Sequence, residues 1–343
     1  MRRCLLAACM ATAALVPTAR GGEPVDRAEE EPEPLKTNWS LGDGVPMPTM
    51  GGMQFWGDEL FFHGWRIQRN VLTGHCRLLD GNNLRHTWGT YEHCRTKLEE
   101  IKKDQNLAPM QGKAVIVLHG LADTRLSMAL LCKHLERKGG YTVFNVAYPS
   151  TRQSIRDHAR ALAKIIRSLD GIEEISFVGH SMGNIVIRHY LADQTDAATG
   201  RRPDPRIRRF VMLGPPNHGS SLAVRFGDEE LFTTVLGKPG EELGRQWTWL
   251  ECDLAVPQCE FGIIAGGLRN DQGFNPLIPG DDDGVVAVAT TRLPGASDFV
   301  MVPVLHPLLP ADSRVMDYAL SFLQNGYFIS ADERQPVGEK DEG

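Results

Sequence analysis

Short runs of apolar residues alternate with helical patterns from residue 113 to residue 323. The apolar runs are continuous rather than alternating, which indicates strands buried on both faces of a parallel sheet. This order predicts the α/β class: a doubly wound, mostly parallel sheet with helices on both faces. The predicted strands are 114–118, 142–146, 175–178, 210–213, 261–265 and 299–302, and the predicted helices are 128–137, 155–169, 184–193 and 313–323.

Residues 40–110 show a weaker pattern. Residues 61–68 and 76–79 predict an antiparallel pair of strands at the leading edge of the same sheet, and residues 88–101 predict a helix that returns to the core. We therefore expect a single domain over residues 39–330. Ligands of such sheets bind beyond the carboxyl ends of the strands, so candidate chemistry is expected there.

The first twenty residues have the pattern of a secretory signal peptide. Arg2 and Arg3 precede an apolar stretch over residues 5–16, and cleavage near Ala19 would release an exported protein, periplasmic or secreted. Lipid anchoring at Cys9 is the alternative interpretation. No other run approaches the ~18 apolar residues of a membrane-spanning helix, so the mature chain is predicted to lack one.

Composition indicates which parts of the chain form a core and which partners are excluded. Residues 21–38 form an acidic, proline-rich linker that we expect to be disordered, and residues 331–343 form a tail of the same character. Hydrophobic residues make up 42% of the chain, enough for a sizeable core. The net charge of −6 argues against a nucleic-acid partner, because no basic stripe is present to neutralise phosphates.

Five cysteines follow the predicted signal peptide. Their spacing suggests two local disulfides, Cys76–Cys94 and Cys252–Cys259, with Cys132 left as a buried thiol in a predicted helix. Spacing alone does not determine connectivity. No C-x-x-C pair is present, so a zinc site of that type is not expected. No metal or cofactor is predicted.

The most informative motif is Gly179-His180-Ser181-Met182-Gly183. It directly follows a predicted strand and directly precedes a predicted helix. A G-x-S-x-G sequence in this context is typical of a nucleophile elbow, a strained turn that raises a serine hydroxyl above the sheet. The motif therefore predicts Ser181 as a nucleophile.

A serine nucleophile needs a base to accept its proton. Three histidines follow Ser181 in the chain. His189 lies two turns into the predicted helix and points away from the strand ends. His218 follows another strand and is a rival base, although a role in shaping the rim of the site is the preferred interpretation. His306 follows the last predicted strand, where the base is expected.

The base needs an acid to orient it, and the acid should lie between the elbow and His306. Asp281-Asp282-Asp283 is the strongest candidate segment. Asp283 is the predicted acid, because it directly precedes Gly284 and an apolar run that can hold it in place. Asp282 is the alternative. A solvated acidic turn or a cation site is the non-catalytic interpretation.

An oxyanion intermediate needs backbone N–H donors. Met182 is expected to supply one, and Leu121, in the loop after the strand 114–118, is expected to supply the other. Gly120 would allow the close approach of that loop, and His119 would support it through hydrogen bonds. The long insertion over residues 222–257 is either a lid or a set of ordinary packed helices.

Taken in order, these motifs resemble those of bacterial lipase- and esterase-like α/β-hydrolases over residues 113–323. The resemblance implies an α/β-hydrolase fold and assigns the nucleophile, acid and base to Ser181, Asp283 and His306, and the oxyanion hole to Leu121 and Met182. Many secreted bacterial lipases carry a calcium-binding acid soon after the histidine. Pro307-Leu308-Leu309-Pro310 follows here, so a structural calcium ion is not expected.

The sequence thus predicts a serine hydrolase that cleaves carboxylic esters through an acyl-enzyme, with lipid-like acyl groups favoured. Its partners would be small-molecule or lipid esters, with transient contact with lipid surfaces. Acyl transfer or amide cleavage by the same triad is an alternative. A non-catalytic binding protein is a further alternative, but its expected sign, a broken triad, is not seen.

Overall fold

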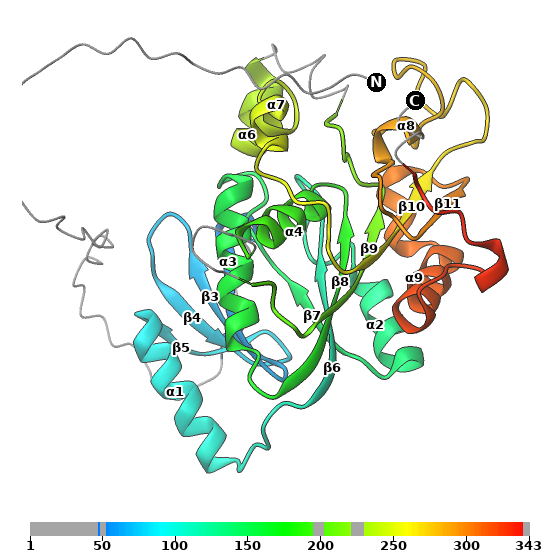
Figure 1. The fold of residues 1–343 in the computed structure, drawn as a ribbon. Helices are drawn as coiled ribbons and strands as arrows, with labels where there is room; N and C mark the ends of the chain where they lie inside the picture. The colour runs from blue at the N-terminus through cyan, green and yellow to red at the C-terminus, as the bar shows by residue number, and fades with distance from the viewer. Residues whose placement is uncertain (1–46, 49–52, 195–201, 221–229, 339–343) are drawn as a thin grey trace, which may run out of the picture. The chain divides into compact units, whose positions relative to one another are not determined.

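A computed structural model describes residues 47–48, 53–194, 202–220 and 230–338 (Figure 1). All of them belong to one compact unit, Thr37–Gly343. The predicted signal peptide at residues 1–20 and the predicted linker at 21–38 lie outside the described residues.

The centre of this unit is a six-stranded parallel sheet, as predicted. Its strand order is β11-β10-β9-β8-β6-β7, and every neighbouring pair is parallel. Each of the six apolar runs forms one strand. Their bounds are β6 Gly112–Leu118, β7 Thr142–Val146, β8 Ile172–His180, β9 Ile207–Leu213, β10 Glu260–Gly266 and β11 Asp298–Val302.

Helices cover both faces of this sheet (Figure 1). One face packs against α2 (Ala129–Gly139) and α9 (Ser313–Asn325), and the other packs against α3 (Ile155–Ser168) and α4 (Met182–Asp193). Alternate strand residues face opposite sides, and both sides are buried. The continuous apolar runs follow from this double burial, because each strand position must be apolar whichever face it points to.

A second sheet precedes the parallel one. It is antiparallel, in the order β1-β5-β4-β3-β2, and is followed by helix α1 (Tyr91–Asp104). Its side facing the domain packs against α3 and β7. The strand bounds are β1 Met47–Pro48, β2 Trp56–Phe62, β3 Trp65–Asn70, β4 Cys76–Leu79 and β5 Leu84–Gly89.

This sheet corrects the prediction of a strand pair at the edge of the parallel sheet. Residues 61–68 are not one strand, because the chain reverses at His63 and Gly64 between β2 and β3. His63 has a φ of 49°, in the left-handed region that a tight turn uses. The sequence did not predict this turn, because apolar residues lie on both sides of it.

The insertion after β9 contains two helices, α6 (Glu230–Leu243) and α7 (Trp247–Glu251). Helix α6 is interrupted at Gly237, where φ is 62°. The Glu242 carboxylate accepts a hydrogen bond from the N–H of Ile155, 2.8 Å away, and so caps the first turn of α3. The remaining short helices are η1 Met53–Phe55, α8 Val288–Thr291, η2 His306–Ala311 and η3 Ala331–Glu333.

The chain end differs from the expected disordered tail as far as residue 338. The N–H of Val337 donates to the carbonyl of Ala296 over 2.9 Å, and its own carbonyl accepts from Gly295 over 3.0 Å. The Val337 side chain is buried in the core, and the Asp298 carboxylate accepts from the N–H of Gln335. One buried valine and these backbone bonds hold a segment whose composition is otherwise polar.

Two further expectations concern membranes and disulfides. Within the described ranges, no helix has the length and apolar character that crossing a bilayer requires. No disulfide joins the described cysteines, which corrects the suggested Cys76–Cys94 and Cys252–Cys259 pairs. Cys76 and Cys94 are both buried in the core. Cys252 is exposed, and its thiol is directed to the carbonyl of Thr248, one turn back in the same helical segment.

Candidate active site

Ser181 lies in the turn between β8 and α4, at the carboxyl end of the parallel sheet. Its φ and ψ are 54° and −125°, a region that costs a residue with a side chain about 1–3 kcal/mol. The Ser181 N–H donates to the carbonyl of Leu213 at the end of the neighbouring strand β9, 2.9 Å away. This bond ties the strained turn to the sheet and keeps the serine in its unusual conformation.

The two glycines of the elbow are required by close packing. A Cβ at Gly179 would overlap the side chain of Asn184. A Cβ at Gly183 would lie 2.7 Å from the carbonyl oxygens of both Leu118 and His119. Helix α4 therefore begins directly against the end of β6, which no larger residue would permit.

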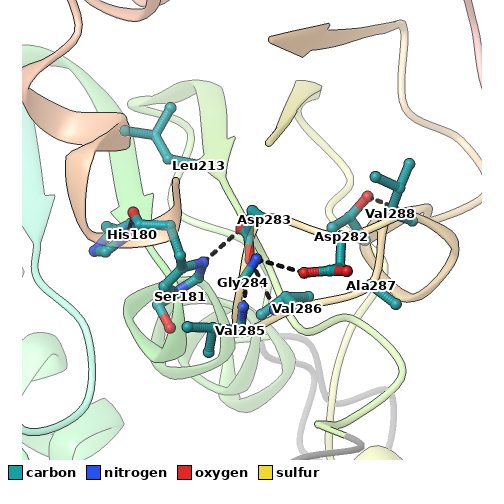
Figure 2. Close-up of polar contacts among 12 residues, drawn as sticks. His180, Ser181, Leu213, Asp282, Asp283, Gly284, Val285, Val286, Ala287 and Val288 are labelled. Atoms are coloured by element: carbon teal, nitrogen blue, oxygen red, sulfur yellow. Dashed lines mark hydrogen bonds and ion pairs between the residues drawn. The ribbon is translucent and has the colours of Figure 1, made fainter. Parts of the chain in front are cut away.

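His306 and Asp283 are in direct polar contact at this edge of the sheet. Nδ1 of His306 and Oδ2 of Asp283 are 2.6 Å apart, and both side chains are buried. The N–H of His306 also donates to the Asp283 carbonyl over 2.8 Å. The other carboxylate oxygen accepts from the N–H groups of Val285 and Val286, at 3.0 and 2.7 Å (Figure 2). The carboxylate thus has three contacts from two segments, and one of them is to an imidazole nitrogen.

The other ring nitrogen of His306 is available to a reacting hydroxyl. Nε2 of His306 has no hydrogen-bond partner among the described residues, although it is buried. The ring lies beside the elbow: it is 4.8 Å from the His180 ring, and His180 Nε2 donates to the His306 carbonyl over 3.0 Å. Because Asp283 holds the proton on Nδ1, Nε2 is the atom that can accept a proton from a hydroxyl.

The loop after β6 approaches the serine from the other side. A Cβ at Gly120 would lie 3.0 Å from Cβ of Ser181 and 3.6 Å from its hydroxyl oxygen. Leu121, the next residue, and Met182, the first residue of α4, therefore flank the serine. The N–H of Met182 belongs to the first turn of a helix, where amides lack intrahelical acceptors. The loop after β6 and the first turn of α4 thus both lie next to Ser181.

His119 supports this loop and stays uncharged. Its Nδ1 lies 2.9 Å from the Gly120 carbonyl, and its ring stacks on Tyr148 at 4.2 Å. Burial lowers the pKa of His119 to about 4, so its Nδ1 donates as a neutral imidazole at pH 7. The Tyr148 hydroxyl donates to the His119 carbonyl. Sequence reasoning missed Tyr148, since a tyrosine after a strand carries no recognisable signal.

The three consecutive aspartates have three separate roles. Asp281 accepts from the N–H groups of Leu268 and Arg269. Asp282 is fully buried and accepts from the N–H of Gly284 (Figure 2). It also accepts from the N–H of Asn275, so it holds two loops together. Only Asp283 bonds His306. In the described part of the chain, no group of acidic, histidine or cysteine side chains is arranged to hold a metal ion.

His218, the rival base, is directed elsewhere. Its Nε2 lies 2.9 Å from the carbonyl of Arg292, and its Nδ1 is 3.5 Å from the Glu251 carboxylate. The neighbouring Asn217 is fully buried: its side chain donates to the carbonyl of Thr291 and accepts from the Arg188 guanidinium. The Pro-Pro-Asn-His segment therefore joins α4 to the loops around the site, with Asn217 as its central residue.

The comparisons with known proteins agree with this architecture. A sequence model described as the alpha/beta hydrolase fold matches residues 113–237. The chain has the α/β-hydrolase fold, with an additional antiparallel sheet before it. No curated protein sequence matches this chain.

Solved structures with a similar fold include lipases and phospholipases at low identity. A lipase of Bacillus licheniformis in its mature form is 20% identical, with a TM-score of 0.42, over 64% of this chain and 92% of that one. The lin2722 gene product of Listeria innocua is 16% identical, with a TM-score of 0.44, over 65% and 97%. The phospholipase PlaB of Legionella pneumophila is 20% identical, with a TM-score of 0.40, over 52% and 44%.

Proposed function

We propose that this protein is a serine hydrolase that cleaves carboxylic esters through an acyl-enzyme. The observation that carries the proposal is the 2.6 Å contact between Asp283 and Nδ1 of His306, which leaves Nε2 open beside the elbow of Ser181. An orienting carboxylate, an imidazole and a strained serine at one edge of the sheet are the three parts that activation of a hydroxyl requires.

The reaction follows from these positions. The Ser181 hydroxyl attacks the ester carbonyl carbon while its proton passes to Nε2 of His306, and Asp283 stabilises the resulting imidazolium. The N–H groups of Leu121 and Met182 bind the oxygen that becomes negative. The intermediate collapses as His306 returns the proton to the departing alcohol. Water then repeats the sequence on the acyl-serine and releases the acid.

The apolar residues around the site favour a substrate with an acyl chain. Leu305 and Leu308, on either side of the base, are 39% and 53% exposed, and Val285, next to the acid, is 36% exposed. Leu305 also packs against the loop of the acid, since a Cβ at Gly284 would be 3.3 Å from it. Exposed apolar side chains this close to the reacting groups support lipid-like esters over charged substrates.

The test is labelling by a fluorophosphonate probe, followed by p-nitrophenyl esters of increasing acyl length. We expect labelling and turnover of the wild type and loss of both in Ser181→Ala. Ser176→Ala is the matched control, because Ser176 is buried in the same strand, away from the elbow. Ser181→Ala protein with full esterase activity would overturn the proposal. Faster turnover in the presence of an alcohol or amine acceptor would instead support acyl transfer.

We also propose that the protein is exported, on the sequence pattern of residues 1–20. The mass of the protein recovered outside the cytoplasm tests this. Loss of about twenty residues supports cleavage by a signal peptidase, and a lipid-modified Cys9 supports the anchored alternative. An intact, unmodified N-terminus on protein confined to the cytoplasm would contradict export.

A further inference from the structure

The additional N-terminal sheet contacts the loop that carries the proposed oxyanion donor. We propose that this sheet, together with the short helix η1 that leads into it, is a positioning element for catalysis, which holds the loop 119–127 against Ser181 through Gln54, Asp58 and Asn83. The inference rests on the proposed function, since it assigns the sheet a role in placing the N–H of Leu121. Each contact that carries it joins a residue of the sheet, of its β4–β5 turn or of η1 to this loop or to a residue that holds the loop.

The first contact is at the tip of the loop. Ala122 has a φ of 55°, an unfavourable conformation for alanine, and it directly follows Leu121. The Gln54 side chain donates to the carbonyl of Asp123, the next residue, over 2.7 Å. The Thr151 hydroxyl lies 3.5 Å from Oε1 of Gln54, so Thr151 helps to orient the Gln54 amide. Gln54 thus supports the strained peptide beside the oxyanion donor.

The second contact reaches the start of the loop. The N–H of Asp58, in β2, donates to the Ala147 carbonyl over 2.8 Å, and the Asp58 carboxylate accepts from the Ala147 N–H over 2.6 Å. Ala147 directly precedes Tyr148, which donates to the carbonyl of His119 and stacks on its ring. Asp58 therefore fixes the backbone from which Tyr148 holds the first residue of the loop.

The third contact is on the far side of the loop. Asn83, in the turn between β4 and β5, accepts from the Arg125 guanidinium over 3.3 Å. The Asn145 side chain donates to the Arg125 carbonyl over 2.8 Å. Asn83 has a φ of 63° and also accepts from the guanidinium of Arg66 in β3. The loop is thus held at its tip by η1, and at its start and its end by the sheet and its β4–β5 turn.

The physical consequence is a requirement on distance. An oxyanion donor must lie about 2.7–3.1 Å from the developing charge, and a displacement of 1 Å can cost roughly 100-fold in rate. Gln54→Met removes the shorter of two hydrogen bonds to the Asp123 carbonyl, leaving that of the Ser150 hydroxyl at 3.4 Å, and keeps the side-chain volume. We expect kcat to fall about tenfold, because the other two contacts remain, while KM changes less than twofold.

The experiment compares Gln54→Met with His63→Asn in the full-length protein. His63 is the matched control: its side chain also joins the sheet to a backbone carbonyl, that of Ala108, over 2.8 Å, and that carbonyl lies outside the loop 119–127. Asparagine tolerates the left-handed backbone at this position and is too short to make the bond. Three measurements are made: kcat and KM for a p-nitrophenyl ester, the inhibition constant of phenylboronic acid, and amide hydrogen exchange over residues 119–127.

The proposal expects three changes in Gln54→Met alone: lower kcat, weaker boronic acid binding by a similar factor, and faster exchange in residues 119–127. Faster exchange is a readout that does not depend on catalysis. Gln54→Met with unchanged kcat and exchange would overturn the inference while leaving the proposed function intact. An equal loss in His63→Asn, or a rise in KM alone, would overturn it too. A wild type that the fluorophosphonate does not label would overturn the proposed function and the inference with it.

Discussion

Replacement of Asp283 by asparagine tests the assignment of the acid with little change in shape. The carboxylate makes three side-chain contacts: two to backbone N–H groups through Oδ1 and one to His306 through Oδ2. Asparagine can keep both backbone bonds with its carbonyl oxygen. Its NH₂ group then faces Nδ1 of His306, which must become an acceptor. The proton moves to Nε2, and the imidazole can no longer take a proton from Ser181.

The expected loss is large in rate and small in stability. Wrong-tautomer substitutions of this kind cost about 10³–10⁴ in kcat, or roughly 4–5 kcal/mol of transition-state stabilisation. The free energy of unfolding should fall by only about 1–2 kcal/mol, because the number of hydrogen bonds is preserved. KM should change little, since Asp283 is fully buried and does not touch substrate.

The assay measures kcat on a p-nitrophenyl ester together with urea unfolding. Asp282→Asn is the control, because Asp282 is an equally buried neighbour whose carboxylate accepts only backbone N–H groups. We expect this variant to keep at least a tenth of wild-type kcat. A larger loss in Asp282→Asn than in Asp283→Asn, or a loss below tenfold in Asp283→Asn, would refute the reasoning.

Three further predictions follow from burial and packing. Burial lowers the pKa of His119 to about 4 and that of His158 to about 3, whereas both are near 6.5 when unfolded. The unfolded state therefore binds more protons below pH 6.5, and each histidine should lower the free energy of unfolding by roughly 2 kcal/mol at pH 5. Urea unfolding at pH 7.5 and 5.0 measures this loss, and equal free energies of unfolding at the two pH values would contradict it. Gly183→Ala should lose about 1–3 kcal/mol of stability, together with activity, because its methyl group meets two carbonyl oxygens at 2.7 Å. Urea unfolding and kcat measure the two losses, and an unchanged variant would mean that α4 can shift freely. Iodoacetamide should modify exposed Cys252 much faster than Cys259, because burial raises the pKa of the Cys259 thiol to about 12. Mass spectrometry follows the reaction, and protection of both cysteines would contradict this prediction and indicate a disulfide.

Much of the fold could be predicted because its signals are local. Each parallel strand is a continuous apolar run, and the glycines of the elbow report a close approach that no other residue allows. His306 could be chosen among the histidines by its place after the last strand. The structure brings it to Asp283, as the order of motifs suggested.

The sequence could not separate the roles of neighbours of equal chemistry. Asp281, Asp282 and Asp283 are identical side chains, and only the path of the loop directs one to the imidazole and the other two to backbone amides. The turn at His63 was also missed, because apolar residues flank it and a histidine is not a typical turn signal.

The amino-acid sequence by itself determined the layered α/β core, the strained serine and the order of the motifs, because these depend on hydrophobic period and on residues adjacent in the chain. Tertiary structure alone decided that Gln54 supports Asp123 and that Tyr148 supports His119. Such contacts join residues 29 and 69 positions apart. They depend on where whole sheets and loops come to lie, and no local pattern encodes that placement.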